Sequence, residues 1–251
     1  MILGIFDSGL GGLTVLKEIV KDNVFDKIIY YGDTKRIPYG DKDKETLFEY
    51  AKEDIAFLRE KGAQALVVAC GTISSNVLED IKKDYDFKMV GIIDVACKEA
   101  TTVTNNNRIG VIATNATINT HAFKNKLEQY KDVEVYEVAC QKFAPLIESG
   151  KKDSLEMDEA IKEYLSPLKE KDVDTIIYGC THYPILEDKI KKFMNKDVNL
   201  INSGKLLSKE FNVGEKKKPI IEFYVSGDVE DFKKKAKQLI DIEDLNNVNN
   251  K

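Results

Sequence analysis

Short apolar runs alternate along the chain with segments of helical periodicity. In the helical segments, apolar residues recur every three or four positions, as at Leu47, Ala51, Ile55 and Leu58. This alternation predicts parallel sheets covered by helices on both faces. The predicted strands are Ile2–Phe6, Lys27–Tyr31, Ala65–Ala69, Lys88–Ile93, Arg108–Ala113, Val133–Ala139, Asp174–Gly179, Val198–Ile201 and Ile220–Val225. The predicted helices are Leu13–Val20, Lys44–Lys61, Ser74–Lys83, Asn119–Tyr130, Asp153–Lys171, Ile185–Asn195 and Val229–Ile240.

The landmarks of the first half of the chain recur in the second half. Asp7 and Pro38 are 31 positions apart, and so are Thr114 and Pro145. A cysteine then follows the third strand of each half. A repeat of this length indicates a duplicated half-protein rather than a solenoid unit. The alternative is a chance match between two α/β halves, since such units share a common size. We therefore predict an α/β protein of two pseudo-symmetric three-layer α/β/α domains, with mostly parallel sheets and the active site between the domains.

The restart of the pattern places the domain boundaries. Residues 1–95 together with 207–251 are predicted to form the first α/β domain, and residues 96–206 the second. The last strand and helix lie outside the repeat and are expected to return to the first domain. The polar end, Asn246–Lys251, is predicted to be disordered.

Composition excludes several classes of function. The hydrophobic content of 43% and charged content of 32% are typical of a soluble globular protein. A net charge of −5 supplies no basic field for nucleic acid. No apolar run approaches the roughly 18 residues of a membrane span, and the start lacks a signal-peptide pattern, so we expect a cytoplasmic protein with no membrane partner. The four cysteines contain no Cys-x-x-Cys pair, which predicts free thiols and no metal site.

Two of the cysteines, Cys70 and Cys180, each follow a predicted strand at the edge where α/β sheets bind their ligands. Two thiols facing one substrate suit the removal of a proton from one face of a carbon and its return to the other face. A helix is expected to begin beside each thiol and to lower its pKa. His182 near Cys180, and Asp7 near Cys70, are predicted to assist proton transfer.

The alternative for this pair is two buried core thiols, which is the commonest fate of cysteine. The polar residues that follow both members favour the chemical interpretation. Cys97 and Cys140 lack that context and are predicted to lie in the core, and His121 is predicted to lie on the surface.

Two glycine-containing loops are candidate parts of the same site. The turn Asp7-Ser8-Gly9-Leu10-Gly11-Gly12 is typical of an anion cradle, or else of a tight βα turn. Because it matches neither the dinucleotide fingerprint nor the P-loop, a carboxylate is the favoured anion. Ile37-Pro38-Tyr39-Gly40 either closes over the ligand or is an ordinary turn.

Five motifs in the same order resemble the glutamate racemase family of the aspartate/glutamate racemase superfamily. They are the Asp7–Gly12 turn, Tyr30–Thr34 with Pro38-Tyr39-Gly40, Ala69-Cys70-Gly71-Thr72, Pro145–Gly150 and Gly179–Pro184, with Tyr224–Asp228 further along. The resemblance runs from residue 3 to about residue 240. It implies a cytoplasmic enzyme, commonly a homodimer, that racemises glutamate without pyridoxal phosphate or another cofactor and supplies D-glutamate for peptidoglycan.

The resemblance also assigns residues. Cys70 would remove the α-proton of D-glutamate, and Cys180 that of L-glutamate. The matching substrate-binding positions are Asp7, Ser8, Tyr39, Gly40, Gly71, Thr72, Thr114, Thr117, Glu148, Thr181 and His182.

One departure from the family keeps alternatives open. Gly71 stands where the family usually has asparagine, so an amide that would grip the substrate is absent. The choice of substrate therefore stays open to aspartate or another amino acid. Two alternatives of a different class do not depend on Gly71: a regulatory protein that binds an acidic metabolite and has inert thiols, and a redox-sensing dithiol protein.

Overall fold

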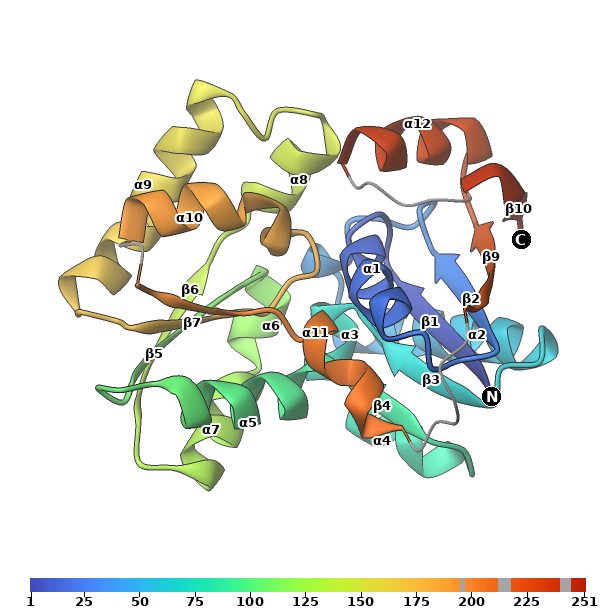
Figure 1. The fold of residues 1–251 in the computed structure, drawn as a ribbon, viewed down its shortest axis with the longest axis horizontal. Helices are drawn as coiled ribbons and strands as arrows, with labels where there is room; N and C mark the ends of the chain where they lie inside the picture. Colours follow the sequence, from blue (N-terminus) through green and yellow to red (C-terminus); the bar gives the residue numbers. More distant parts are fainter. Residues whose placement is uncertain (195–196, 212–217, 240–244) are drawn as a thin grey trace.

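The fold consists of two parallel β-sheets that lie side by side, each covered by helices (Figure 1). The computed structural model describes residues 1–194, 197–211, 218–239 and 245–251. The first sheet has the order β10-β9-β2-β1-β3-β4, with β1 (Ile2–Asp7), β2 (Lys27–Gly32), β3 (Ala65–Val68), β4 (Met89–Gly91), β9 (Ile220–Val225) and β10 (Val248–Asn250). The second has the order β6-β5-β7-β8, with β5 (Arg108–Ala113), β6 (Glu134–Ala139), β7 (Thr175–Tyr178) and β8 (Asn199–Ile201).

Every strand pairing among the described residues is parallel, so the predicted α/β class is confirmed. The order β2-β1-β3-β4 in the first sheet recurs as β6-β5-β7-β8 in the second. This shared order is the pseudo-symmetry that the repeated spacing predicted. β9 pairs with β2, so the last predicted strand does return to the first sheet.

The strands read as continuous apolar runs because both of their faces are buried. In β1, Ile5 points into a cluster that includes helices α1 and α12, while Phe6 points into a cluster that includes α2. The second sheet is likewise covered by α5 and α7 on one face and by α8, α9 and α10 on the other. The helices are α1 (Gly12–Asp22), α2 (Lys44–Glu60), α3 (Gly71–Asn76), α4 (Leu78–Ile81), α5 (Ile92–Val103), α6 (Asn115–Asn119), α7 (Ala122–Tyr130), α8 (Phe143–Glu148), α9 (Leu155–Glu170), α10 (Glu187–Met194), α11 (Gly204–Leu207) and α12 (Val229–Leu239).

The link between the sheets differs from the sequence prediction. The run Lys88–Ile93 was predicted to be a strand, but β4 ends at Gly91, and Ile92 begins the unpredicted helix α5. The predicted domain boundaries at 95/96 and 206/207 fall inside α5 and α11, and one hydrophobic cluster extends from the first sheet to the second. The division into two domains stays a prediction.

The end of the described chain is ordered, which corrects the prediction of disorder for Asn246–Lys251. β10 adds a parallel strand to β9, and the Lys251 ammonium lies 4.7 Å from the centre of the Tyr31 ring. Ile240 and Asn195, the last residues of two predicted helices, lie outside the described residues. A search of the described helices found none whose length and apolar character would carry it through a bilayer.

Candidate active site

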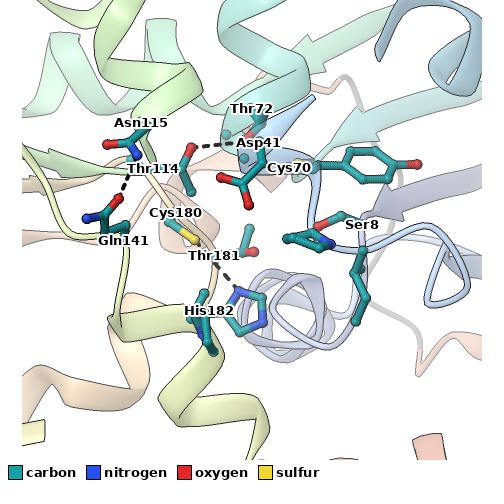
Figure 2. A pocket seen from close by; sticks show the side chains of 18 of the residues that line it. Ser8, Asp41, Cys70, Thr72, Thr114, Asn115, Gln141, Cys180, Thr181 and His182 are labelled. Carbon is teal, nitrogen blue, oxygen red and sulfur yellow. Dashed lines mark hydrogen bonds between the residues drawn. The ribbon is translucent and has the colours of Figure 1, made fainter. Parts of the chain in front are cut away.

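A cavity of about 310 Å³ lies between the two sheets, where the carboxyl ends of their strands face each other. Figure 2 shows Cys70 and Ser8 on one side of this cavity and Cys180 on the other. The lining residues come from the segments that follow β1, β2 and β3 and from those that follow β5, β6 and β7. They are Ser8, Ile37, Pro38, Tyr39, Gly40, Asp41, Cys70, Gly71, Thr72, Thr114, Asn115, Gln141, Ala144, Pro145, Glu148, Gly179, Cys180, Thr181 and His182.

The structure therefore brings nearly all of the predicted site residues together. Asp7 and Thr117 are the two that do not line the cavity, and both are buried beside it. The hydroxyl oxygens of Thr117 and Thr114 lie 3.1 Å apart, and Thr114 does line the cavity. The Thr114 hydroxyl also lies 3.1 Å from the Thr72 hydroxyl, so this chain of hydroxyls joins the two halves of the site (Figure 2).

The turn after β1 cradles a carboxylate that belongs to the chain itself. The N–H groups of Gly9 and Gly12 donate to Asp7 Oδ2 at 3.1 and 2.9 Å. The Thr181 hydroxyl donates to Asp7 Oδ1 at 3.2 Å, across the boundary between the halves. Burial raises the pKa of Asp7 even though these donors oppose the shift. The predicted anion cradle exists, but these two N–H groups bind Asp7 and do not face the cavity.

Cys70 is the residue just before α3, at the carboxyl end of β3. Burial raises the pKa of its thiol to about 12, and the charge of the Asp7 carboxylate adds to the rise. The Ile73 N–H and the Ser8 hydroxyl act in the opposite direction but are weaker. The prediction that a helix N-terminus lowers this pKa is therefore wrong, because burial outweighs it and favours the neutral thiol.

Cys180 has a different environment, because a chain of two side chains leads away from its sulfur. Cys180 Sγ lies 3.7 Å from His182 Nδ1 (Figure 2). His182 Nε2 in turn lies 2.8 Å from Glu148 Oε1. Burial alone would lower the pKa of His182, but the hydrogen bonds to Cys180 and Glu148 raise it well above its ordinary value. Burial would raise the pKa of Glu148, but the hydrogen bond from His182 lowers it. These two hydrogen bonds therefore favour the charged imidazolium form of His182 beside Cys180.

Three polar residues that the sequence analysis did not select also line the cavity. Asp41 follows the Tyr39-Gly40 pair, and Asn115 donates to Gln141 at 2.7 Å (Figure 2). Gln141 was accessible to prediction, since it follows the predicted strand Val133–Ala139 at the carboxyl edge of the second sheet, where Cys180 also lies. No lysine or arginine is among the lining residues that the structure describes, so hydroxyl and N–H groups are the donors available to an anionic substrate.

The residues predicted to lie outside the site do so. Cys97 and Cys140 are buried and do not line the cavity. The His121 side chain is 60% exposed and lies 2.5 Å from Glu137 on the surface. Within the described ranges, no group of three or more His, Cys, Asp or Glu side chains is placed to hold a metal ion.

Comparison with known proteins adds an independent line of evidence. The family model described as Asp/Glu/Hydantoin racemase matches residues 30–210. The chain is 44% identical over 205 residues to a glutamate racemase of Persephonella marina, covering 82% of this chain and 79% of that protein. It is 38% identical to glutamate racemase 2 of Caldanaerobacter subterraneus, covering 95% and 92%. Among solved structures, glutamate racemase isoform RacE1 of Bacillus anthracis superposes with a TM-score of 0.91 at 31% identity, covering 100% of this chain and 96% of that one. The glutamate racemase of Francisella tularensis in complex with D-glutamate has a TM-score of 0.87 at 31% identity, covering 99% and 95%.

Proposed function

Because the chain belongs to the Asp/Glu/hydantoin racemase family, we propose that it interconverts L-glutamate and D-glutamate with Cys70 and Cys180 as two bases. The observation that carries the proposal is the placement of the two thiols on opposite sides of one cavity. Their environments differ in the way that such a reaction requires. Burial raises the pKa of Cys70, which favours a thiol that can give a proton, whereas Cys180 Sγ lies 3.7 Å from His182, whose pKa is also raised.

In the proposed reaction, the Cys180 thiolate takes the α-proton of L-glutamate and becomes a thiol. The electron pair left on Cα is stabilised by donors at the turns near Ser8, Thr72 and Thr181. The Cys70 thiol then gives its proton to the opposite face of Cα, which yields D-glutamate and leaves Cys70 as the thiolate. The reverse direction exchanges the two roles, so no proton or electron is gained or lost overall.

Support for glutamate as the substrate comes from the named relatives and from the cavity. Several relatives that align over most of this chain carry the name glutamate racemase. Four of the hydroxyl-bearing residues at the cavity wall, Ser8, Thr72, Thr114 and Thr181, are candidates to hold its two carboxylates and its ammonium group. We further propose that the enzyme is a cytoplasmic homodimer and that its D-glutamate enters peptidoglycan.

The test is proton exchange in the absence of pyridoxal phosphate. The purified protein is incubated with L-glutamate in D₂O while circular dichroism follows the loss of optical activity and NMR follows deuterium at Cα. We expect racemisation with deuterium incorporation. Turnover of aspartate but not of glutamate would keep the mechanism and replace the substrate, and no exchange with any amino acid would refute the proposal.

Single cysteine variants then test the two bases. Cys70→Ala and Cys180→Ala should each lower racemisation by at least about 100-fold, the lower range of a lost general acid or base. Cys97→Ala is the matched control, since Cys97 is an equally buried thiol away from the cavity. Full racemisation by Cys70→Ala would exclude the two-base scheme.

A further inference from the structure

The turn after β1 and the start of α1, both in the first half of the chain, pack directly against the segment that carries Cys180. That segment, Cys180-Thr181-His182, belongs to the second half. A Cβ atom added to Gly11 would lie 2.2 Å from the Thr181 hydroxyl oxygen and 2.5 Å from His182 Nδ1. Carbon and oxygen atoms in contact lie about 3.3–3.6 Å apart. The Thr181 hydroxyl and the His182 ring therefore occupy the space that a side chain at residue 11 would need.

Neither of these side chains can turn away without breaking its other contacts. The Thr181 hydroxyl donates to Asp7 Oδ1 at 3.2 Å. His182 Nε2 lies 2.8 Å from Glu148 Oε1. Thr181 is 6% exposed and His182 is 4% exposed, so there is little free space around either one. The bare backbone at Gly11 is thus a condition for the observed place of the His182 ring.

A hydroxyl in the first turn of α1 holds the backbone of the same segment. The Thr14 hydroxyl donates to the carbonyl oxygen of Thr181 at 2.7 Å. It also lies 2.9 Å from the Gly11 carbonyl oxygen, but that oxygen already accepts the Thr14 N–H.

The Thr181 carbonyl needs a donor from elsewhere because of the sequence that follows it. The chain after Thr181 turns tightly, and its N–H groups bond to carbonyl groups three residues earlier. The residue three positions after Thr181 is Pro184, which has no N–H to donate. Thr14 thus supplies, from the other half of the chain, the donor that position 184 lacks.

We propose that Gly11 and Thr14 are positioning residues, which fix Thr181 and His182 beside Cys180 from the opposite half of the chain. This inference rests on the two-base function proposed above, in which Cys180 exchanges a proton with the substrate carbon. Neither Gly11 nor Thr14 is among the described residues that line the cavity, so each acts through the segment that it contacts.

The distances give the size of the effect. Gly11→Ala would place a carbon 2.2 Å from the Thr181 hydroxyl oxygen, so the segment must move by roughly 1 Å. A misplacement of about 1 Å in an active site costs on the order of 100-fold in rate, and we expect kcat to fall by about that factor. The change in KM should be smaller, because the hydroxyls of Thr72 and Thr114 still line the cavity.

Two substitutions at Thr14 separate the hydroxyl from the rest of the side chain. Thr14→Val keeps the shape of the side chain and removes only the donor. We expect kcat to fall by about tenfold, near the lower end of what an unpaired buried carbonyl costs. Thr14→Ser keeps the hydroxyl and should retain at least about half of the wild-type kcat.

A second measurement follows the His182 ring without turnover. The sequence holds two histidines, His182 and the exposed His121. Labelling histidine with ¹³C and ¹⁵N therefore gives the NMR signals of two rings, and His121→Gln assigns them. Titration of the wild type and of each variant then yields the pKa of His182, with His121 as the internal reference.

The charges around His182 give the direction of the expected change. Hydrogen bonds to Cys180 and Glu148, in the second half, raise the pKa of His182 well above its ordinary value, against the effect of burial. The Asp7 carboxyl of the first half also interacts with the charge of His182. A ring displaced from these partners should lose its proton at lower pH. The pKa of His182 should therefore fall in both variants that lower kcat.

Gly4→Ala is the matched control for an added methyl group. Its Cβ would lie 2.3 Å from the Leu66 side chain inside the first sheet, away from the cavity. It should lower the stability of the fold but change neither kcat per folded molecule nor the pKa of His182.

The outcomes separate this inference from the proposed function. Wild-type kcat in Thr14→Val would overturn the inference, even if Gly11→Ala does not fold. An equal loss of kcat in Thr14→Ser and Thr14→Val, or a loss with an unchanged pKa of His182, would also overturn it. If the wild type racemises no amino acid while the pKa of His182 falls in Gly11→Ala and Thr14→Val but not in Gly4→Ala, the proposed function fails and the positioning role stands.

Discussion

The chain from Cys180 through His182 to Glu148 makes a sharp prediction for Glu148→Gln. In the wild-type chain, Glu148 Oε1 lies 2.8 Å from His182 Nε2. The substitution keeps the size of the side chain and its ability to accept a hydrogen bond from His182, but it removes the negative charge. The carboxylate is one of the two groups that raise the pKa of His182. Its loss therefore lowers the pKa of His182 and reduces the positive charge that His182 presents to Cys180 Sγ, 3.7 Å away.

The magnitude follows from the hydrogen bond that changes. A hydrogen bond to a charged group contributes about 1.5–3 kcal/mol, against about 0.5–1.5 kcal/mol for a neutral one. The His182 side chain is 5% exposed and that of Glu148 is 20% exposed, so solvent screening reduces this difference little. A loss of about 1–2 kcal/mol corresponds to a decrease of roughly 5–30-fold in kcat/KM.

The assay follows racemisation by circular dichroism from both enantiomers over a range of pH. L- and D-glutamate have equal free energies in water, so kcat/KM must fall by the same factor in both directions. A direction-dependent effect can appear only in kcat and KM separately. Because Glu148→Gln lowers the pKa of His182, the imidazolium is lost at lower pH, and the alkaline fall of kcat/KM should move to lower pH.

The control is a second Glu–His pair in the same chain. Glu137→Gln removes the carboxylate that lies 2.5 Å from the exposed His121, and it should leave all kinetic parameters unchanged. If kcat/KM of Glu148→Gln stays within about twofold of wild type and its alkaline limb does not move, the assignment of His182 as the charged partner of Cys180 is wrong.

Three further predictions concern stability and binding. Burial and the neighbouring Asp33 carboxyl raise the pKa of Asp54 from 3.8 to about 7, so the folded protein holds a proton that the unfolded chain releases. The free energy of unfolding should thus fall as pH rises between 3.8 and about 7, by up to about 1.4 kcal/mol per pH unit, and Asp54→Asn should flatten that slope in urea titrations. Tyr39→Phe removes the hydroxyl that donates to Asp33 at 2.5 Å, so it should lower the free energy of unfolding in urea by about 1–3 kcal/mol. Because Tyr39 also lines the cavity, KM should rise, and an unchanged KM would show that Tyr39 stabilises the fold without contributing to substrate binding. Leu165→Ala in the fully buried core of the second half should cost about 2–5 kcal/mol in the same titration without altering kcat.

The strands and the two cysteines were predictable because each depends on a short stretch of sequence. β3 and β7 are continuous apolar runs that are buried on both faces, and a cysteine follows each of them. Strand position alone placed each thiol at the carboxyl edge of its own sheet, and the facing of these two edges brings the thiols to one cavity. The sequence could not indicate that the N–H groups of Gly9 and Gly12 would bind the Asp7 carboxylate, because those contacts depend on the path of the backbone through the glycines.

The missed helix α5 shows where periodicity gives an ambiguous answer. Ile92 and Ile93 extend the apolar run Lys88–Ile93, and β-branched residues favour a strand. In the structure Gly91 is the residue that precedes the helix, and Ile92, Ala96 and Ala100 recur every four positions on its buried side. That helical spacing was present in the sequence, but a strand signal overlapped its first turn.

The segment Asn246–Lys251 was predicted to be disordered because composition describes a segment without its neighbours. Its asparagines form no apolar pattern, yet Val248 pairs with Phe223 of β9 in the parallel sheet. Lys251 lies over the Tyr31 ring and 3.5 Å from the Asp54 carboxylate. These partners lie far away along the chain, so no local rule could reveal them.

The same limit explains why the two cysteine turns looked alike in sequence but differ in charge. Each follows a buried strand, and each is followed by a hydroxyl residue. The difference lies in the residues that come from elsewhere in the chain. Glu148, 34 positions before His182, holds the histidine beside Cys180, whereas the charge of Asp7 opposes a thiolate on Cys70. A symmetric backbone thus carries an asymmetric set of charged neighbours, with the Asp7 carboxylate near Cys70 and the His182–Glu148 pair beside Cys180. The proposed two-base reaction needs one thiolate and one thiol, because two thiolates would leave no acid and two thiols would leave no base.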